Sequence, residues 1–239
     1  MSNRSLYIVW GVTGGLGEGV SLALANAGHD VIGYARDVNK VNSSILDAEH
    51  IEIRSMVISE SFYRQECAYL EGRGLTIAGI VDCVGSTQTP SDATLTQRFK
   101  DIMTPNLFHP YASTLIFAPV MAENASIVLV SSIRALTGTD NQNIEYAFAK
   151  AAVENLARSL VHHLKATKVR CNVVRPTPIL GTQMSRAWSP QIIEELESKA
   201  LYGTLLRVDD IVPVVVFLLS PSSLAINGTV IDTSGSFGL

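Results

Sequence analysis

Short apolar runs alternate with amphipathic segments along the chain, and this alternation limits the fold more than any other feature of the sequence. Near-continuous apolar runs are typical of strands that are buried on both faces. Strands of this kind separated by helices predict a mostly parallel sheet with helices on both faces. We therefore expect a single doubly wound α/β domain over residues 1–239, built on a seven-stranded sheet.

The expected elements follow from the apolar periodicity and from the glycines and prolines that end the runs. The strands are residues 6–10, 31–35, 51–53, 77–84, 127–130, 169–174 and 229–231. The main helices are residues 16–27, 59–71, 145–167 and 209–219. In such a sheet ligands bind beyond the carboxyl ends of the strands, and the polar residues discussed below lie at those ends.

Composition favours a folded protein in a reducing compartment. Hydrophobic residues make up 47% of the chain and charged residues 17%, which is enough apolar material for a large core. The scarcity of charge fits either that core or a buried interface in a homodimer or homotetramer. Cys67, Cys83 and Cys171 form no metal-binding pair. Free thiols and the lack of a signal peptide predict a cytoplasmic protein without a metal.

Charge and hydropathy argue against two classes of partner. The formal net charge is −4 and no basic stripe appears, so nothing favours binding to nucleic acid or to an anionic membrane. The longest strongly apolar run, residues 211–219, is too short to span a bilayer. We therefore expect a small molecule as the partner.

A glycine-rich turn follows the first expected strand. The segment reads Gly-Val-Thr-Gly-Gly-Leu-Gly, with Gly11, Gly15 and Gly17 in a G-x-x-x-G-x-G spacing. The next helix directs its free N–H groups and the positive end of its dipole at this turn, where a pyrophosphate would sit. No Lys-Ser/Thr follows the glycines, which excludes a nucleoside-triphosphatase loop. We expect the turn, including Thr13 and Leu16, to bind a dinucleotide, and the alternative is a merely structural turn.

The end of the second expected strand indicates which dinucleotide. An acidic residue at the last strand position would bind the ribose 2′-OH of NAD, but this position is Ala35. Arg36 instead offers a guanidinium to the 2′-phosphate of NADP. The sequence therefore favours NADP(H) over NAD(H). The alternatives are that Arg36 pairs with Asp37 or another surface carboxylate, or that Asp37 turns inward to the ribose.

Tyr146 and Lys150 are four residues apart on the long expected helix and therefore share one face. A lysine ammonium beside a phenol favours the phenolate, and the charge of an oxidised nicotinamide would add to this effect. A tyrosine with a lowered pKa can exchange a proton with a carbonyl or alcohol oxygen. The alternative is a helix-face pair without a chemical role.

Two further polar residues fit the same site. Ser132 lies at the end of a buried strand, where its hydroxyl can hydrogen-bond a substrate oxygen. Asn106 lies in a helical segment between the strand that ends at Gly85 and Ser132, and its alternative role is a cap or turn beside Pro105.

At this point the sequence resembles the short-chain dehydrogenase/reductase family over essentially the whole chain. The glycine turn matches the family's cofactor glycines, and residues 170–176 resemble its sixth strand, which ends in a proline near the nicotinamide. The short length points away from the branch with an added C-terminal substrate domain. Four residues match the catalytic tetrad in order and context: Asn106, Ser132, Tyr146 and Lys150.

The resemblance implies a Rossmann-type fold and an NADP(H)-dependent oxidoreductase that moves a hydride between nicotinamide and a carbonyl or alcohol carbon. It implies that Tyr146 is the general acid/base, that Ser132 stabilises the oxyanion, and that Lys150 holds the nicotinamide ribose and lowers the pKa of Tyr146. It also implies that Asn106 anchors a water that returns protons through Lys150. The further cofactor contacts that it implies are Val84, Gly85, Pro176, Ile179 and Thr182, beside Tyr146 and Lys150.

The chain departs from the family pattern at several positions. Asp82-Cys83-Val84-Gly85 stands where the family has Asn-Asn-Ala-Gly, and Val57 stands where an adenine-contacting Asp is usual. Ser132 and Tyr146 are 14 residues apart, one more than is usual, which implies an inserted residue in the 137–144 loop. These departures predict altered cofactor affinity with the chemical groups intact.

The substrate is the least determined part of the prediction. Residues 183–203 are expected to form a lid, with Met184 and Trp188 as apolar lining or, equally, as core residues. Arg134 is a candidate for binding a substrate carboxylate, against the alternative of a surface salt bridge. Two other classes of function remain open: a non-catalytic NADP-binding regulator on the same fold, and a structural interaction subunit.

Overall fold

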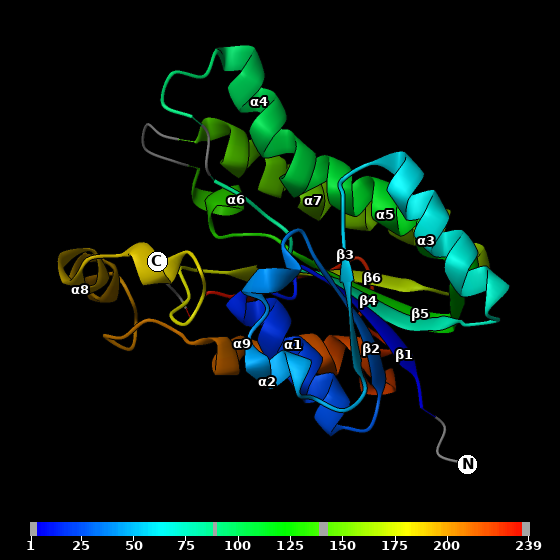
Figure 1. Cartoon of the computed structure of the whole chain (residues 1–239). Coiled ribbons are helices and arrows are strands. Elements are labelled where there is room, and N and C mark those ends of the chain that lie inside the picture. Colours follow the sequence, from blue (N-terminus) through cyan, green and yellow to red (C-terminus); the bar gives the residue numbers. More distant parts are fainter. Residues whose placement is uncertain (1–3, 88–89, 139–142, 236–239) are drawn as a thin grey trace.

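The computed structural model describes residues 4–87, 90–138 and 143–235, and it confirms the α/β Rossmann-like fold. The seven strands form one sheet in the order β3-β2-β1-β4-β5-β6-β7, and every strand pair is parallel (Figure 1). The strands are β1 (Leu6–Trp10), β2 (Asp30–Ala35), β3 (Ile51–Ser55), β4 (Ile77–Asp82), β5 (Met121–Val130), β6 (Arg170–Pro176) and β7 (Val230–Thr233).

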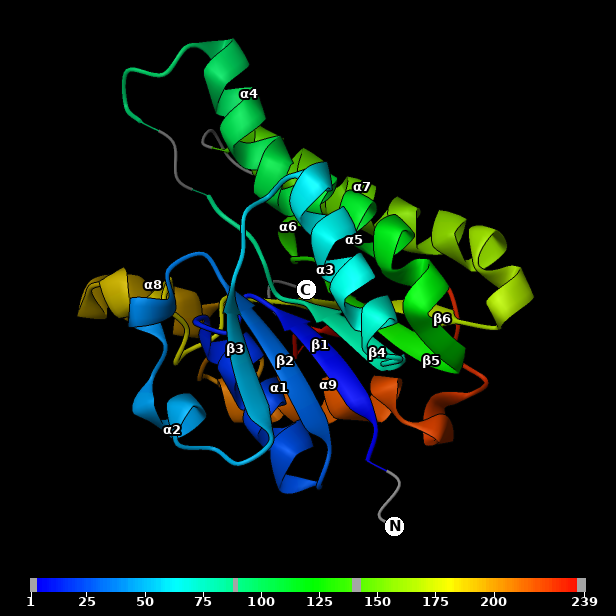
Figure 2. The same cartoon turned by 45° about the vertical axis from the view of Figure 1, so that its right-hand side comes forward.

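Helices cover both faces of the sheet. The helices are α1 (Gly15–Asn26), α2 (Ser43–Leu46), α3 (Glu60–Gly72), α4 (Leu95–Met103), α5 (His109–Phe117), α6 (Arg134–Thr137), α7 (Ile144–His163), α8 (Pro190–Ser198) and α9 (Val208–Leu219). The views in Figures 1 and 2 place α3, α5 and α7 on one face and α1 and α9 on the other. A π-helical turn, Thr104–Phe108, joins α4 to α5.

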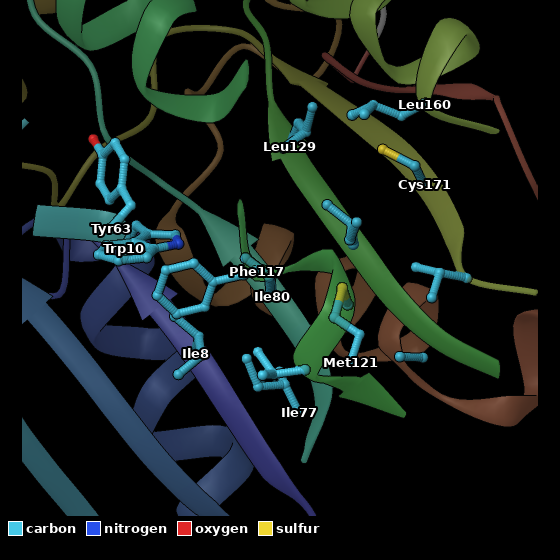
Figure 3. Close-up of a cluster of buried hydrophobic side chains, with 14 of the residues drawn as sticks. Ile8, Trp10, Tyr63, Ile77, Ile80, Phe117, Met121, Leu129, Leu160 and Cys171 are labelled. Carbon is cyan, nitrogen blue, oxygen red and sulfur yellow. The ribbon is translucent and has the colours of Figure 1, made fainter. Parts of the chain in front are cut away.

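The two-sided core follows from the alternation of side chains along the strands. In β1, Ile8 and Trp10 point into the core beneath α3, α5 and α7, part of which Figure 3 shows. Tyr7 and Val9 point the other way, into the core beneath α1 and α9. Burial on both faces explains why β1 is apolar throughout. The same packing holds β1 in place, and with it the glycine turn that follows the strand.

Several element boundaries differ from those expected. Strand β5 begins at Met121 rather than at residue 127. Its first half was not predicted because it contains the polar Glu123 and the positive-φ Asn124, which interrupt the apolar run. Helix α7 ends at His163, and residues 165–167 form a 3₁₀ turn. The short helix α2 was not predicted. Residues 139–142, where an inserted residue was expected, lie outside the described part of the chain.

Over the described ranges, no helix is both long enough and apolar enough to cross a membrane.

Candidate active site

The candidate site lies where the carboxyl ends of the parallel strands meet at one edge of the sheet. The order of the strands reverses between β1 and β4, which opens a crevice at this edge. The glycine turn follows β1, and Arg36 follows β2. Ser132 follows β5, and Pro176 ends β6. The topology therefore gathers residues that are far apart in sequence at one edge.

The glycine turn has a backbone that suits an anionic guest. Gly11 has φ +83°, a conformation that favours glycine. The N–H groups of Gly11 and Val12 donate to the Tyr34 carbonyl oxygen at 2.9 and 3.2 Å, which fixes the turn against the end of β2. Gly14 is the N-cap of α1, and no side chain caps this helix. The first N–H groups of α1 therefore remain available to a pyrophosphate, with Thr13 beside them.

The residues around this turn pack too closely for larger side chains. A Cβ on Gly17 would overlap with the Gly11 carbonyl oxygen, and a Cβ on Gly15 would overlap with the Gly181 carbonyl oxygen. The second contact shows that the segment after β6, which includes Ile179 and Thr182, packs against the turn. Leu16 is buried in the core, so only its backbone faces the turn.

We expect Gly17→Ala to destabilise the protein and to weaken dinucleotide binding. The added methyl group must displace the Gly11 carbonyl, and overpacking of this kind costs about 1–3 kcal/mol. Gly72→Ala is the matched control, because a Cβ at Gly72 meets no atom within 4 Å. Urea unfolding and calorimetric titration with a nicotinamide dinucleotide measure the two effects. Equal stability of the two variants would show that the turn tolerates the methyl group.

A cavity of about 370 Å³ lies beside the end of β2. Arg36 and Lys100 line it, and neither cation has an ion-pair partner among the described residues. Asp37 does not line this cavity, and its carboxylate is engaged elsewhere: Oδ1 accepts the Asn39 N–H at 3.1 Å and Oδ2 lies 3.6 Å from Lys40 Nζ. The other lining residues are Ile58, Ser86, Asp101, Thr104 and Pro105. The cavity thus presents two positive side chains where a 2′-phosphate was predicted to bind.

Tyr146 and Ser132 meet at the substrate end of the site. The Ser132 side chain is close enough to the Tyr146 hydroxyl to act on its pKa. Burial raises the pKa of Tyr146, while the Ser132 side chain and the charge of Arg134 lower it. The phenol of Tyr146 therefore keeps its proton when no dinucleotide is bound. Arg134 is close enough for its charge to act on Tyr146.

Lys150 lies on the same face of α7 as Tyr146 and is almost fully buried. Its Nζ donates to the Val130 carbonyl oxygen at 2.9 Å and lies 5.7 Å from the centre of the Tyr146 ring. Burial lowers the pKa of Lys150 to about 8, although the charge of Asp82 raises it. The ammonium is thus held at a fixed place beside the phenol and retains most of its charge at neutral pH.

Asn106 lies in the π-helical turn, and its side chain is buried. Its Nδ2 donates to the carbonyl oxygens of Ser86 and Ile102 at 2.7 and 2.8 Å, and its Oδ1 accepts the Ser86 N–H at 3.3 Å. The side chain therefore ties the loop after β4, which carries Gly85, to the helix. π-helical turns are frequent at functional sites, and this one places Asn106 beside Gly85 and Lys150.

The remaining predicted residues divide into two groups. Pro176 accepts the Ile133 N–H at 2.8 Å through its carbonyl oxygen, and Thr182 Oγ1 donates to the Ile179 carbonyl oxygen at 3.2 Å, so both lie in hydrogen-bonded segments after β5 and β6. Met184 is 49% exposed and Trp188 is partly buried. Neither belongs to the hydrophobic core, so the core alternative for these two residues is wrong.

The altered segment after β4 is well ordered. Asp82 Oδ1 accepts the Val84 N–H at 2.9 Å, and both residues are buried. Cys83 is partly buried, and burial raises the pKa of its thiol. Val57 is exposed, and its neighbour Ile58 lines the cavity instead.

Sequence reasoning missed several residues of the site. Lys100, Asp101 and Thr104 reach the cavity from α4 and the π-helical turn, but no motif marks them. His109 and Asp82 are buried behind Lys150, and only the replacement of Asn by Asp82 gave a signal that this region is unusual.

Comparison with known proteins is consistent with this geometry. The family sequence model described as "Enoyl-(Acyl carrier protein) reductase" matches residues 11–236. An L-xylulose reductase from Caenorhabditis elegans is 29% identical over 243 residues, covering 96% of this chain and 94% of the relative. An NADPH-dependent aldehyde reductase 2, chloroplastic, from Arabidopsis thaliana is 38% identical over 110 residues, covering 46% of this chain and 40% of the relative.

A solved short-chain type dehydrogenase/reductase from Mycobacterium ulcerans superposes with a TM-score of 0.87 at 23% identity, covering 99% of this chain and 90% of that chain. The chain belongs to the short-chain dehydrogenase/reductase family. It is an oxidoreductase of that family that acts on carbonyl or alcohol substrates.

Proposed function

We propose that this protein is an NADP(H)-dependent reductase of ketones or aldehydes, or a dehydrogenase of the matching alcohols, with Tyr146 as the general acid/base. The observation that carries the proposal is the placement of two groups beside one phenol: Lys150 Nζ lies 5.7 Å from the centre of the Tyr146 ring, and the Ser132 side chain is close enough to lower the pKa of Tyr146. These groups and the glycine turn share the carboxyl edge of the sheet, where ligands of this fold bind.

The chain's own residues account for the proton chemistry of carbonyl reduction. The substrate oxygen lies between the hydroxyls of Ser132 and Tyr146. As negative charge develops on that oxygen, Tyr146 donates its proton and Ser132 donates a hydrogen bond. Lys150 favours the phenolate that remains, because its ammonium is held beside the ring. The raised pKa of Tyr146 keeps the phenol protonated beforehand, which suits a general acid.

A nicotinamide dinucleotide supplies the hydride when it is bound. The glycine turn fits its pyrophosphate, because the α1 N–H groups have no side-chain cap and no Cβ fits at Gly17. The further proposed contacts of the dinucleotide are Val84, Gly85, Pro176, Ile179 and Thr182. Lys150 would hold the ribose.

Two observations support NADP(H) over NAD(H). Arg36 and Lys100 both line the cavity beside β2. Of the two nearby carboxylates, Asp37 is engaged with Asn39 and Lys40, and Asp101, which also lines the cavity, accepts a hydrogen bond from Gln97 at 2.6 Å. The Arabidopsis relative is named as NADPH-dependent. A guanidinium binds a phosphate by charge-assisted hydrogen bonds, whereas it gains little from a ribose hydroxyl.

The proposed molecule has three further features. Residues 1–239 form one domain, in which 183–203 act as the substrate lid with Met184 and Trp188 exposed enough to contact a ligand. It is a homodimer or homotetramer, supported by exposed apolar side chains such as Leu95 and Phe99 on α4. It is cytoplasmic, supported by its free cysteines. Sedimentation of the purified protein tests the oligomeric state.

The test of the function is NADPH oxidation with a panel of sugars, small ketones, aldehydes and steroid ketones. We expect turnover of at least one compound, faster with NADPH than with NADH. Cofactor binding by calorimetry without turnover across the panel would favour the non-catalytic NADP-binding regulator. Absence of both binding and turnover would favour a structural interaction subunit.

A further inference from the structure

A pair of buried titratable side chains lies behind Lys150, and the proposed reaction uses neither. Asp82 ends β4 and is 3% exposed, and His109 begins α5 and is 0% exposed. Asp82 Oδ2 and His109 Nε2 are 3.4 Å apart, and neither atom has a hydrogen-bond partner within the described ranges. Buried polar atoms are normally paired, so this arrangement calls for an explanation.

The protonation of His109 follows from its other neighbour. Tyr63 Oη lies 2.5 Å from His109 Nδ1, and burial raises the pKa of Tyr63, so we assign the protonated phenol as the hydrogen-bond donor and Nδ1 as the acceptor. The proton of the neutral imidazole is then on Nε2, which faces Asp82. Burial also lowers the pKa of His109. His109 is therefore a neutral ring that presents an N–H dipole to the carboxylate.

Asp82 faces Lys150 on its other side. Both residues line one small enclosed hollow, together with Asn106 and Val130. Burial is the largest effect on Asp82 and raises its pKa, whereas the charge of Lys150 lowers that pKa. Burial lowers the pKa of Lys150, and the charge of Asp82 raises it.

The other groups near Lys150 do not provide a free negative charge. Tyr146 is a protonated phenol, and Cys83 is a thiol with a raised pKa. Glu154, one turn along α7, lies 3.3 Å from an Arg175 nitrogen and accepts a hydrogen bond from Ser131. Asp82 is thus the carboxylate near Lys150 that has no permanent cation of its own among the described side chains.

We propose that Asp82 is the buried counter-ion of Lys150, kept ionised by the N–H of neutral His109, and that its charge sets the pH range in which the Tyr146–Lys150 pair works. Asp82 is a positioning residue, since it acts through Lys150. In a buried site an opposite charge favours the ammonium strongly, because little solvent screens the pair. The interaction between the charges of Asp82 and Lys150 does not depend on the proposed reaction. Only its effect on the pH range of activity rests on the proposed function.

The first experiment follows Lys150 directly. The ¹³Cε resonances of labelled lysines are titrated by NMR in the full-length protein, and Lys150→Arg identifies the signal of Lys150. We expect a midpoint at about pH 8 in the wild type. In Asp82→Asn the midpoint moves down by about one pH unit, because the ammonium loses its counter-charge. Asp30→Asn, at the opposite end of the sheet, serves as control and leaves the midpoint unchanged. An unmoved midpoint in Asp82→Asn overturns the proposal.

The second experiment measures the pH profile of alcohol oxidation. Without the negative charge of Asp82, the Tyr146–Lys150 pair loses its first proton more easily, so the acid limb of kcat/KM moves to lower pH. The plateau of kcat/KM also falls. When the pair holds one proton, the active form has that proton on Lys150 and Tyr146 as the phenolate, and this form becomes rarer without the charge of Asp82. A merely structural role for Asp82 would lower the plateau and leave the limb in place. A shifted Lys150 resonance in a protein without turnover would support the coupling and contradict the proposed function.

The wild-type protein gives a third readout if Asp82→Asn does not fold. The ¹⁵N spectrum of the histidine rings, assigned with His109→Gln, reports the protonation of His109. A neutral ring with the proton on Nε2 at pH 7 supports the proposal. An imidazolium at this position would neutralise Asp82 and overturn it.

Discussion

Replacing Tyr146 with Phe is expected to lower kcat/KM for carbonyl reduction by about 10³-fold, within the range of 10²–10⁴ typical of a lost general acid. The variant removes one oxygen and keeps the ring that packs near Lys150. The substrate oxygen then has no proton donor beyond Ser132, whose Oγ still accepts the Arg134 N–H at 3.3 Å. Dinucleotide affinity is expected to stay nearly constant, since the glycine turn is unchanged. Steady-state kinetics and calorimetric titration measure the two quantities.

The control for this experiment is Tyr111→Phe, which removes the same oxygen from a half-exposed tyrosine on α5. Its activity is expected to equal that of the wild type. Near wild-type turnover in Tyr146→Phe would remove the role given to Tyr146. A parallel loss of dinucleotide affinity would show instead that the substitution disturbs the cofactor site.

The second large effect is expected at Arg36. Hydrogen bonds to charged groups are worth about 1.5–3 kcal/mol, so Arg36→Leu is expected to weaken NADPH binding by about 10- to 100-fold. NADH has no 2′-phosphate, so its affinity is expected to change little. Lys100→Leu, at another residue that lines the same cavity, is expected to have a smaller effect in the same direction, because lysine does not make the bidentate contact of arginine. Calorimetric titration of each variant with both dinucleotides measures these changes.

Arg64→Leu is the control for Arg36→Leu. Arg64 is an exposed arginine on α3 that pairs with Glu60, and it does not line the cavity. Its loss is expected to leave both affinities unchanged. If Arg36→Leu weakens the binding of NADPH and NADH equally, Arg36 does not contact the 2′-phosphate. If the wild type binds NADH more tightly than NADPH, the preference for NADP(H) is wrong.

The parts of the site that follow a strand were predictable from the sequence. A parallel sheet brings all carboxyl ends to one edge, so the glycine turn, Arg36 and Ser132 had to meet there once their strands were recognised. Tyr146 and Lys150 had to share a face of α7, because four residues make about one helical turn. In these cases a local pattern and a simple rule of topology suffice.

Contacts made across the site were not predictable in this way. Lys100 lines the cavity from α4, which packs against α7 and the π-helical turn, and no sequence motif marks this packing. The burial of His109 against Asp82 depends on how α5 packs against β4. Asp82 and His109 are 109 − 82 = 27 positions apart, and Arg36 and Lys100 are 100 − 36 = 64 apart, so no periodicity along the chain relates them.

The aromatic packing of the core has a practical consequence. Trp10 is fully buried, stacks on Tyr34, and lies edge-on to His109 with ring centres 5.2 Å apart. An indole so close to an imidazole changes its fluorescence when the imidazole becomes charged. With Trp188, the other tryptophan of the chain, replaced by Phe, the emission of this single indole gives an optical record of acid titration in the interior, without any label or substrate.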